Sequence, residues 1–170
     1  MVASAIRILG LDPGLARMGW GAIEISGSRL SHVAHGVLTS NPKAGLGARL
    51  FALHAALCAV IADVRPSAIA VEQAFVAKDP QAALKLGHAR AVALLAAAQA
   101  GLDIAEYAPN HIKKSVAGTG HADKDQVLLM VRRLLPTARL TAADAADALA
   151  CAIAHAHFAG TRARILEALA

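Results

Sequence analysis

The chain has 170 residues, which is enough for one compact domain with its own core and too few for two well-developed ones. Hydrophobic residues make up 56% of the sequence and aromatic residues only 3%, so much of the apolar content is alanine, which favours tightly packed helices. Lys and Arg total 17 against 12 Asp and Glu, and the net charge of +5 suits a polyanionic partner, although many solvated surfaces are also rich in lysine.

The sequence also argues against export and against insertion into a membrane. Charged residues interrupt the apolar run at the N-terminus that a signal peptide would need. Only twelve uncharged residues separate Arg90 from Asp103, whereas a helix that crosses a bilayer needs about 20. Cys58 and Cys151 lie in separate apolar stretches, which favours buried free thiols in a reducing compartment, and a disulfide between them stays open. We therefore expect a cytoplasmic protein with no membrane partner.

The N-terminal part of the chain predicts three antiparallel strands. The apolar run 6–11 ends at Asp12-Pro13-Gly14, which indicates a strand followed by a turn. Residues 18–25 and 30–38 flank Ser26-Gly27-Ser28, which predicts a hairpin.

The middle of the chain predicts a helix and then a buried strand. Over residues 46–62 leucine and isoleucine recur at spacings of three and four, which is typical of an amphipathic helix, and Pro66 ends the pattern. Residues 68–71 are short, apolar and partly β-branched, so they predict a buried strand that ends at Glu72.

The remaining sequence predicts one more strand and four helices. Pro80 can occupy the first turn of a long helix that Gly101 stops, and residues 104–107 indicate the fifth strand. Three helices follow: 109–116, one capped by Asp123, and one from 142 to about 159 capped by Thr141. This order predicts an α/β fold, a mixed five-stranded sheet with helices on both faces. We expect residues 1–170 to form a single domain, and nothing is assigned to the tail after about residue 158.

Four carboxylates stand out by their positions. Asp12 and Glu72 each follow directly on a predicted strand, and an open sheet binds its ligands at such strand ends. Asp144 and Asp147 lie three residues apart and hence on one face of the last helix. Like charges repel in a low-dielectric cleft, so a cluster of these acids predicts a neutralising cation. Oxygen ligands favour Mg²⁺ or Mn²⁺ over zinc.

Each acid except Asp147 also has a plain structural explanation. Asp12 can be the first residue of an ordinary Asp-Pro-Gly turn, and Glu72 can emerge into solvent at the end of its strand. Thr141 and Asp144 have the spacing of a capping box at the start of a helix. Asp147 lies past the first turn among Ala, Leu and Ile, where an unpaired carboxylate would be costly.

Four fragments carry a family pattern in their order and spacing: Ile8-Leu9-Gly10-Leu11-Asp12-Pro13-Gly14, Ala70-Val71-Glu72-Gln73-Ala74-Phe75, Ala82-Ala83-Leu84-Lys85-Leu86-Gly87 and Ala143-Asp144-Ala145-Ala146-Asp147-Ala148-Leu149-Ala150. Together they span about residues 5–158 and resemble the RuvC family of Holliday-junction resolvases. The resemblance implies a ribonuclease H-like fold, a homodimer and a Mg²⁺-dependent endonuclease, in which Mn²⁺ would substitute. It also implies action on four-way junction DNA in recombination and repair, beside a branch-migration motor of the RuvA and RuvB type.

The resemblance assigns catalysis and metal binding to the same four acids: Asp12, Glu72, Asp144 and Asp147. Some relatives have His where this chain has Asp144, so we expect that position to contribute less than the other three. The family's lysines that assist catalysis match Lys113 and Lys124, and its phenylalanine beside the active site matches Phe75, which we expect to contact bases near the junction centre. The chain departs from the pattern at Pro109-Asn110-His111 and in a slightly longer N-terminus.

The hypothesis for the mechanism is phosphodiester hydrolysis by two cations that carboxylates hold close together. We expect Asp12 to be the ligand shared by both ions, because the central strand fixes it most rigidly. In a dimer, two such sites would nick symmetric strands of a four-way junction and separate it into two duplexes.

Several basic residues are candidates for contacts to DNA phosphates. Residues 73–140 hold nine Lys and Arg against five acids, which indicates a positive region. The candidates are Lys78, Lys85, Arg90, Lys113, Lys114 and Lys124, and for each one the alternative is a solvated surface side chain. His155 and His157 are explained by the dipole at the C-terminal end of the last helix.

Two other functions remain as alternatives. A sugar-kinase or actin-like ATPase also begins with an acidic strand end, but it needs a second related domain and a glycine-rich phosphate loop. A non-catalytic junction binder would keep the fold, but a phosphate-binding surface gains nothing from gathering four carboxylates.

Overall fold

The computed structural model describes residues 5–73 and 79–169, with only the backbone given for 162–169. Its centre is a five-stranded sheet in the order β3-β2-β1-β4-β5. The strands are β1 (Ile6–Asp12), β2 (Arg17–Ser26), β3 (Arg29–Thr39), β4 (Ala68–Glu72) and β5 (Asp103–Tyr107). β1, β2 and β3 pair antiparallel, whereas β4 runs parallel to both β1 and β5. The predicted mixed sheet is therefore confirmed.

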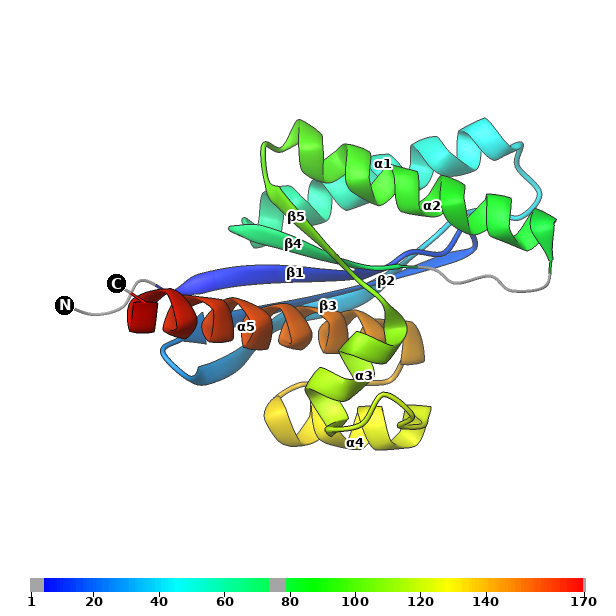
Figure 1. Cartoon of the computed structure of the whole chain (residues 1–170). Coiled ribbons are helices and arrows are strands. Elements are labelled where there is room, and N and C mark those ends of the chain that lie inside the picture. The colour runs from blue at the N-terminus through cyan, green and yellow to red at the C-terminus, as the bar shows by residue number, and fades with distance from the viewer. Residues whose placement is uncertain (1–4, 74–78, 170) are drawn as a thin grey trace.

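Helices cover both faces of this sheet, as predicted (Figure 1). α1 (Leu46–Val64) and α2 (Pro80–Gln99) lie on one face, where Leu53 and Leu57 pack on the buried side chains of Leu9 and Val71. The other face carries α3 (Pro109–Ala117), α4 (Lys124–Leu134) and α5 (Ala143–Leu169). Every predicted helix and strand is present among the described residues, because each rests on a strong periodicity or a proline or glycine boundary.

α5 lies unusually close to the sheet, along a seam of three glycines, Gly10, Gly19 and Gly21. A Cβ atom on Gly10 would lie 2.0 Å from the backbone oxygen of Ala148, and one on Gly19 would lie 2.0 Å from that of Asp144. Gly10 and Gly21 are partners in the β1–β2 pairing, so two neighbouring strands offer bare backbone at the same level. The glycine seam therefore lets an alanine-rich helix rest almost directly on the strands.

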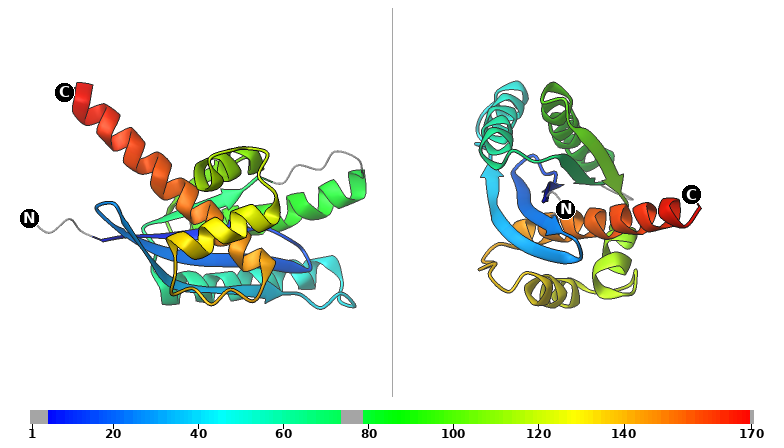
Figure 2. Two further views of the ribbon diagram at one scale, coloured as in Figure 1. Left: turned by 90° about the horizontal axis from the view of Figure 1, so that it is seen from below. Right: turned by 90° about the vertical axis from the view of Figure 1, so that its left-hand side faces the viewer.

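α5 is also longer than the predicted range from 142 to about 159, and this corrects the interpretation of the two histidines in it. It crosses the strands obliquely and extends past the sheet to Leu169 (Figure 2). His155 and His157 therefore lie in its middle and not at its C-terminal end, so the dipole explanation is wrong. The His155 ring nitrogen Nδ1 is 2.8 Å from the Tyr107 hydroxyl, and His157 contacts Ser115, so both histidines join α5 to neighbouring elements.

The two cysteines lie on opposite faces of the sheet, so they form no disulfide with each other. Cys151 is fully buried in the core beneath α5, and Cys58 packs at the edge of the core beneath α1. Among the described helices, α1 is long and apolar enough by length and composition to cross a membrane. One face of this helix, with Leu53, Leu57 and Ile61, is buried against the sheet.

Candidate active site

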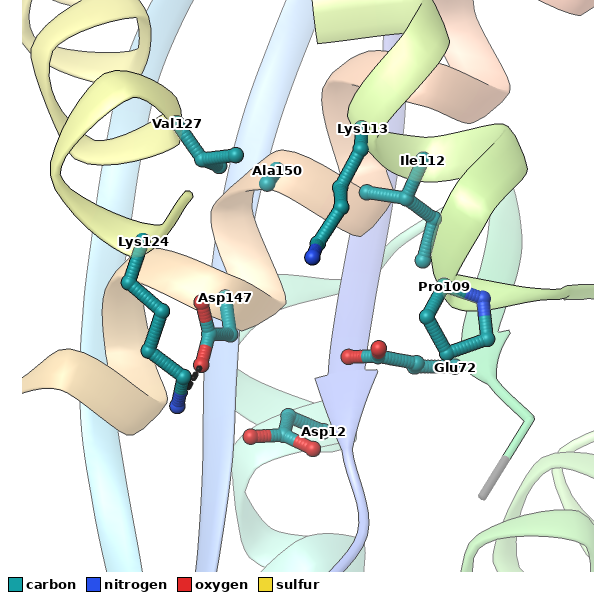
Figure 3. A pocket seen from close by; sticks show the side chains of 9 residues that line it. All are labelled: Asp12, Glu72, Pro109, Ile112, Lys113, Lys124, Val127, Asp147 and Ala150. Atoms are coloured by element: carbon teal, nitrogen blue, oxygen red, sulfur yellow. Dashed lines mark ion pairs between the residues drawn. The ribbon is translucent and has the colours of Figure 1, made fainter. Parts of the chain in front are cut away.

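A cavity of about 300 Å³ opens where the carboxyl ends of β1 and β4 meet the first turns of α5. Figure 3 shows its lining: Asp12, Glu72, Pro109, Ile112, Lys113, Lys124, Val127, Asp147 and Ala150. Five of these are charged, and they come from five different elements of the chain. The cavity therefore collects acids and lysines that are widely separated in the sequence.

Asp12 and Glu72 are brought together by the parallel pairing of β1 and β4. Leu11 and Val71 are partners in that pairing and are fully buried, so the residue that follows each of them emerges at the same edge of the sheet. Asp147 reaches the same cavity from α5 (Figure 3). Three of the four predicted acids thus face one space, although they are up to 135 positions apart (147 − 12).

Two lysines, one from α3 and one from α4, also reach the cavity. Lys113 on α3 points into the cavity beside Glu72 (Figure 3). Lys124 is the first residue of α4, whose start is held by a capping box in which the Asp123 side chain accepts from the backbone N–H of Gln126. The ammonium group of Lys124 lies 3.6 Å from a carboxylate oxygen of Asp147. The predicted lysines are therefore at the site, and one of them partly neutralises it.

The surroundings of these carboxyl groups disfavour their ionised forms. Burial, followed by repulsion from Asp147 and Asp144, raises the pKa of Asp12 to about 7. Burial, followed by repulsion from Asp12 and Asp147, raises the pKa of Glu72 to about 7 as well. The pKa of Asp147 is raised mainly by burial, against the attraction of Lys124. Ionised carboxylates here lack sufficient positive charge from the protein.

Asp144 is placed differently from the other three acids. Its carboxylate accepts a hydrogen bond of 2.6 Å from the Nε of Arg17, at the start of β2, and it does not line the cavity. Its charge still raises the pKa of Asp12, so it lies within electrostatic range of the site. No hydrogen bond joins Asp144 to Thr141 among the described residues, so the capping-box explanation of Asp144 is not supported.

The other predicted DNA contacts are scattered over the surface. Arg90 forms an ion pair with Glu106, so its positive charge is already paired within the protein. Lys85 is exposed on α2, and Lys114 lies next to Lys113 but lines a different groove. Phe75 and Lys78 lie outside the described residues. Of the predicted basic residues, only Lys113 and Lys124 line the cavity among those that the structure describes.

Sequence reasoning missed Arg17 and the apolar wall of the cavity. Arg17 meets Asp144 across 127 residues, and no local pattern signals such a contact. Pro109, Ile112, Val127 and Ala150 read as ordinary boundary or core residues. Ile112 and Val127 lie on the apolar faces of helices whose lysines reach the site, so helical spacing was the available signal.

The donor chemistry of the cavity fits a hard divalent cation. All the candidate ligand atoms are carboxylate oxygens, which Mg²⁺ and Mn²⁺ prefer, and the raised pKa values are those of acids that a cation would stabilise. No three Asp, Glu, His or Cys side chains among the described residues are close enough to share one ion in this arrangement. Asp147 and Asp144 instead pair with Lys124 and Arg17, so these two basic groups would compete with a cation for the carboxylates.

Comparisons with known proteins agree on one family. Residues 8–155 match the family model described as "Crossover junction endodeoxyribonuclease RuvC". A protein of that name from Parvibaculum lavamentivorans is 58% identical over 165 residues, covering 97% of this chain and 94% of the relative. One from a Caulobacter species is 57% identical over 152 residues, covering 89% and 90%.

A solved structure of similar architecture is Thermus thermophilus RuvC in complex with a Holliday junction substrate. It has a TM-score of 0.86 and 34% identity, and the match covers 92% of this chain and 96% of the solved one. A yeast mitochondrial Holliday junction resolvase shares the fold at 15% identity, with a TM-score of 0.65. The expected ribonuclease H-like fold is thereby confirmed.

Proposed function

The chain belongs to the RuvC family of crossover junction endodeoxyribonucleases, and from this membership we propose that its acidic cavity cuts DNA strands at four-way junctions. The substrate would be the sugar-phosphate backbone at the crossover of a Holliday junction, and the products would be two nicked duplexes. The observation that supports this most is the meeting of Asp12, Glu72 and Asp147 in one cavity flanked by two lysines. We propose that the whole chain acts as one nuclease domain.

Two Mg²⁺ ions are proposed as the cofactors, with Mn²⁺ able to substitute. Asp12, Glu72 and Asp147 would hold them, and Asp144 would contribute after release from Arg17. Such ions, when bound, make a water molecule nucleophilic and stabilise the leaving oxygen. The protein's own part is to fix the acids on two buried strands and on a helix that rests directly on the sheet.

The lysines would act on the phosphate itself. An ammonium group in a partly enclosed cavity stabilises the extra negative charge that develops on a phosphate as water adds to it. Lys113 points into the cavity and is suited to this position, while Lys124 must leave Asp147 to reach a phosphate. The roles of both lysines, like those of the acids, rest on geometry and on the family pattern.

The proposed partner in this reaction is a second copy of the chain. An apolar groove runs between α1 and α2 on the outer face, lined by Leu50, Phe51, His54, His88, Ala91, Val92 and Leu95. Phe51 is 73% exposed and Leu95 is 53% exposed, so a single chain leaves large apolar side chains in water. This groove would form the homodimer contact and give two active sites for paired nicks. A branch-migration motor of the RuvA and RuvB type and a cytoplasmic location are proposed from the family.

The test is cleavage of a synthetic four-way junction with Mg²⁺, with the nicked positions mapped on each strand. We expect symmetric nicks near the crossover from the wild type. Asp12→Asn should abolish cleavage while junction binding in EDTA stays close to that of the wild type, because the variant loses a cation ligand and no basic residue. Asp63→Asn, an exposed position on α1, is the matched control and should cut normally.

Two results would contradict the proposal. Full cleavage by Asp12→Asn would remove the acids from the mechanism. Tight binding of junctions by the wild type without any nicks, at every Mg²⁺ or Mn²⁺ concentration tried, would identify a junction binder and not a nuclease.

A further inference from the structure

A second groove, with a mixed polar and apolar lining, lies on the other side of α3 from the acidic cavity. It is lined by His111, Lys114, Ser115, His157, Phe158 and Thr161, and its volume is about 420 Å³. We call it the α3–α5 groove. None of these six residues is acidic, and three of them carry or can carry positive charge. The groove thus has the chemistry of a site for an anion.

The hydrogen bonds inside the groove leave donors free for such an anion. The Nδ1 of His157 lies 3.2 Å from the backbone oxygen of Ser115, and this oxygen can only accept, so Nδ1 carries a proton. The same Nδ1 lies 3.1 Å from the Ser115 hydroxyl, which accepts from it and keeps its own hydrogen for a ligand. Lys114 is exposed and makes no ion pair among the described residues. The Ser115 hydroxyl and the Lys114 ammonium are therefore both available to a phosphate.

The position of the groove relative to the cavity suggests which phosphate it would take. Lys113 lines the cavity and Lys114, the next residue, lines the groove, so α3 forms the wall between them. Along α5, His157 lies ten residues beyond Asp147 (157 − 147), a rise of about 15 Å at about 1.5 Å per residue. For a junction arm that runs along α5, an advance of about 3.4 Å per base pair places the groove about four base-pair steps from the cutting site.

We propose that the α3–α5 groove holds a backbone phosphate of the junction arm that leaves the active site, about four base pairs from the cut. This inference rests on the proposed nuclease function and adds a contact that sets how the arm leaves the protein. Phe158, which is 40% exposed and stacked on Tyr107, adds an apolar surface to the lining of the groove beside the charged groups.

The first experiment measures binding of a synthetic four-way junction in EDTA over a range of salt concentrations. Lys114→Gln should weaken binding by about three- to tenfold and lower the slope of log affinity against log salt by about one, as for one lost phosphate contact. Ser115→Ala should weaken binding with no change of slope, because it removes a neutral donor. Arg65→Gln is the control: it removes one charge from an exposed residue at the C-terminal end of α1, on the other face of the sheet from α3 and α5, and should change neither quantity.

The second experiment locates the phosphate. Single neutral methylphosphonates are placed at about two to six base pairs from the cut, and binding by the wild type and Lys114→Gln is compared. At one position the substitution should weaken wild-type binding and leave the Lys114→Gln variant unaffected. If no position couples to Lys114, or if Lys114→Gln behaves like Arg65→Gln, the inference is wrong. If the wild type neither prefers nor cuts junctions, the proposed function itself fails, so the two failures are distinguishable.

Discussion

Asp12 and Glu72 occupy positions where their negative charges destabilise the folded protein. In the unfolded chain their pKa values return to about 3.8 and 4.5, whereas in the folded protein both are about 7. A carboxyl group with a raised pKa keeps its proton in the folded state after the unfolded chain has lost it. Its contribution to stability is therefore complete below about pH 4 and is lost as the pH rises to about 7. These two groups should therefore stabilise the metal-free protein less at pH 7 and above than at pH 4 and below.

Asp12→Asn tests this directly. At pH 8 in EDTA we expect the variant to be more stable than the wild type by about 1 to 2 kcal/mol, since it removes a buried and repelled charge. The difference should shrink to nearly zero at about pH 3, below the unfolded-state pKa, where the wild-type carboxyl is largely protonated in both states. Urea unfolding at both pH values measures it, with Asp63→Asn as the matched control. A variant less stable than the wild type at pH 8 would contradict the electrostatic account.

Arg17 forms an ion pair with Asp144 and would compete with a metal ion for its carboxylate. Lys124 stands in the same relation to Asp147. The Arg17–Asp144 pair is partly exposed, so breaking it costs little, and a divalent ion can compete for the carboxylate. We expect Arg17→Gln to raise the affinity for Mn²⁺ by about three- to tenfold. Calorimetric titration without DNA measures this change. In an Asp144→Asn background the same substitution should have no effect, and an equal gain there would show that Arg17 acts only through its general charge.

At the scale of elements, the contact between α5 and the sheet decides whether the acids meet. Gly10→Ala would place a methyl group against the backbone of Ala148 and Ala152, which has no flexible side chain to move away. We expect a loss of about 3 kcal/mol in the free energy of unfolding, together with weakened cleavage. The control is Gly87→Ala on the exposed face of α2, where nothing lies within 4 Å and helix propensity predicts a gain of about 0.5 to 1 kcal/mol. Equal effects of the two substitutions in urea unfolding would exclude a steric role for the glycine seam.

The elements themselves were predictable from the sequence because each rests on local rules. Alternation and apolar runs predicted the strands, and strand ends predicted that Asp12 and Glu72 would share an edge. The length of α5 was not predictable, because Gly160 and the preceding histidines resemble a helix end in the sequence. The Arg17–Asp144 pair was missed for a different reason: it depends on how β2 and α5 meet in three dimensions, and residue spacing carries no such information.

At the scale of the whole molecule, the α1–α2 face and the acidic cavity must cooperate if cuts are made in pairs. Leu95→Glu would place a charge in the apolar groove, and we expect it to give monomers and single, unpaired nicks. Leu129→Glu is the matched control, since Leu129 is a 66% exposed leucine on α4, outside the groove. Analytical ultracentrifugation and nick mapping measure the two effects. A Leu95→Glu protein that remains dimeric would show that the copies meet elsewhere.

The glycine seam has a mechanical consequence for the enzyme. In most proteins that pack helices on a sheet, a layer of interdigitated side chains separates the two, and these side chains can adjust to small shifts of the helix. Here Gly10 and Gly19 meet the main chain of α5 directly, so backbone contact with β1 and β2 fixes the position of the helix and therefore of Asp147. The backbone therefore sets the spacing between the acids, and substitutions in the surrounding core should change that spacing little.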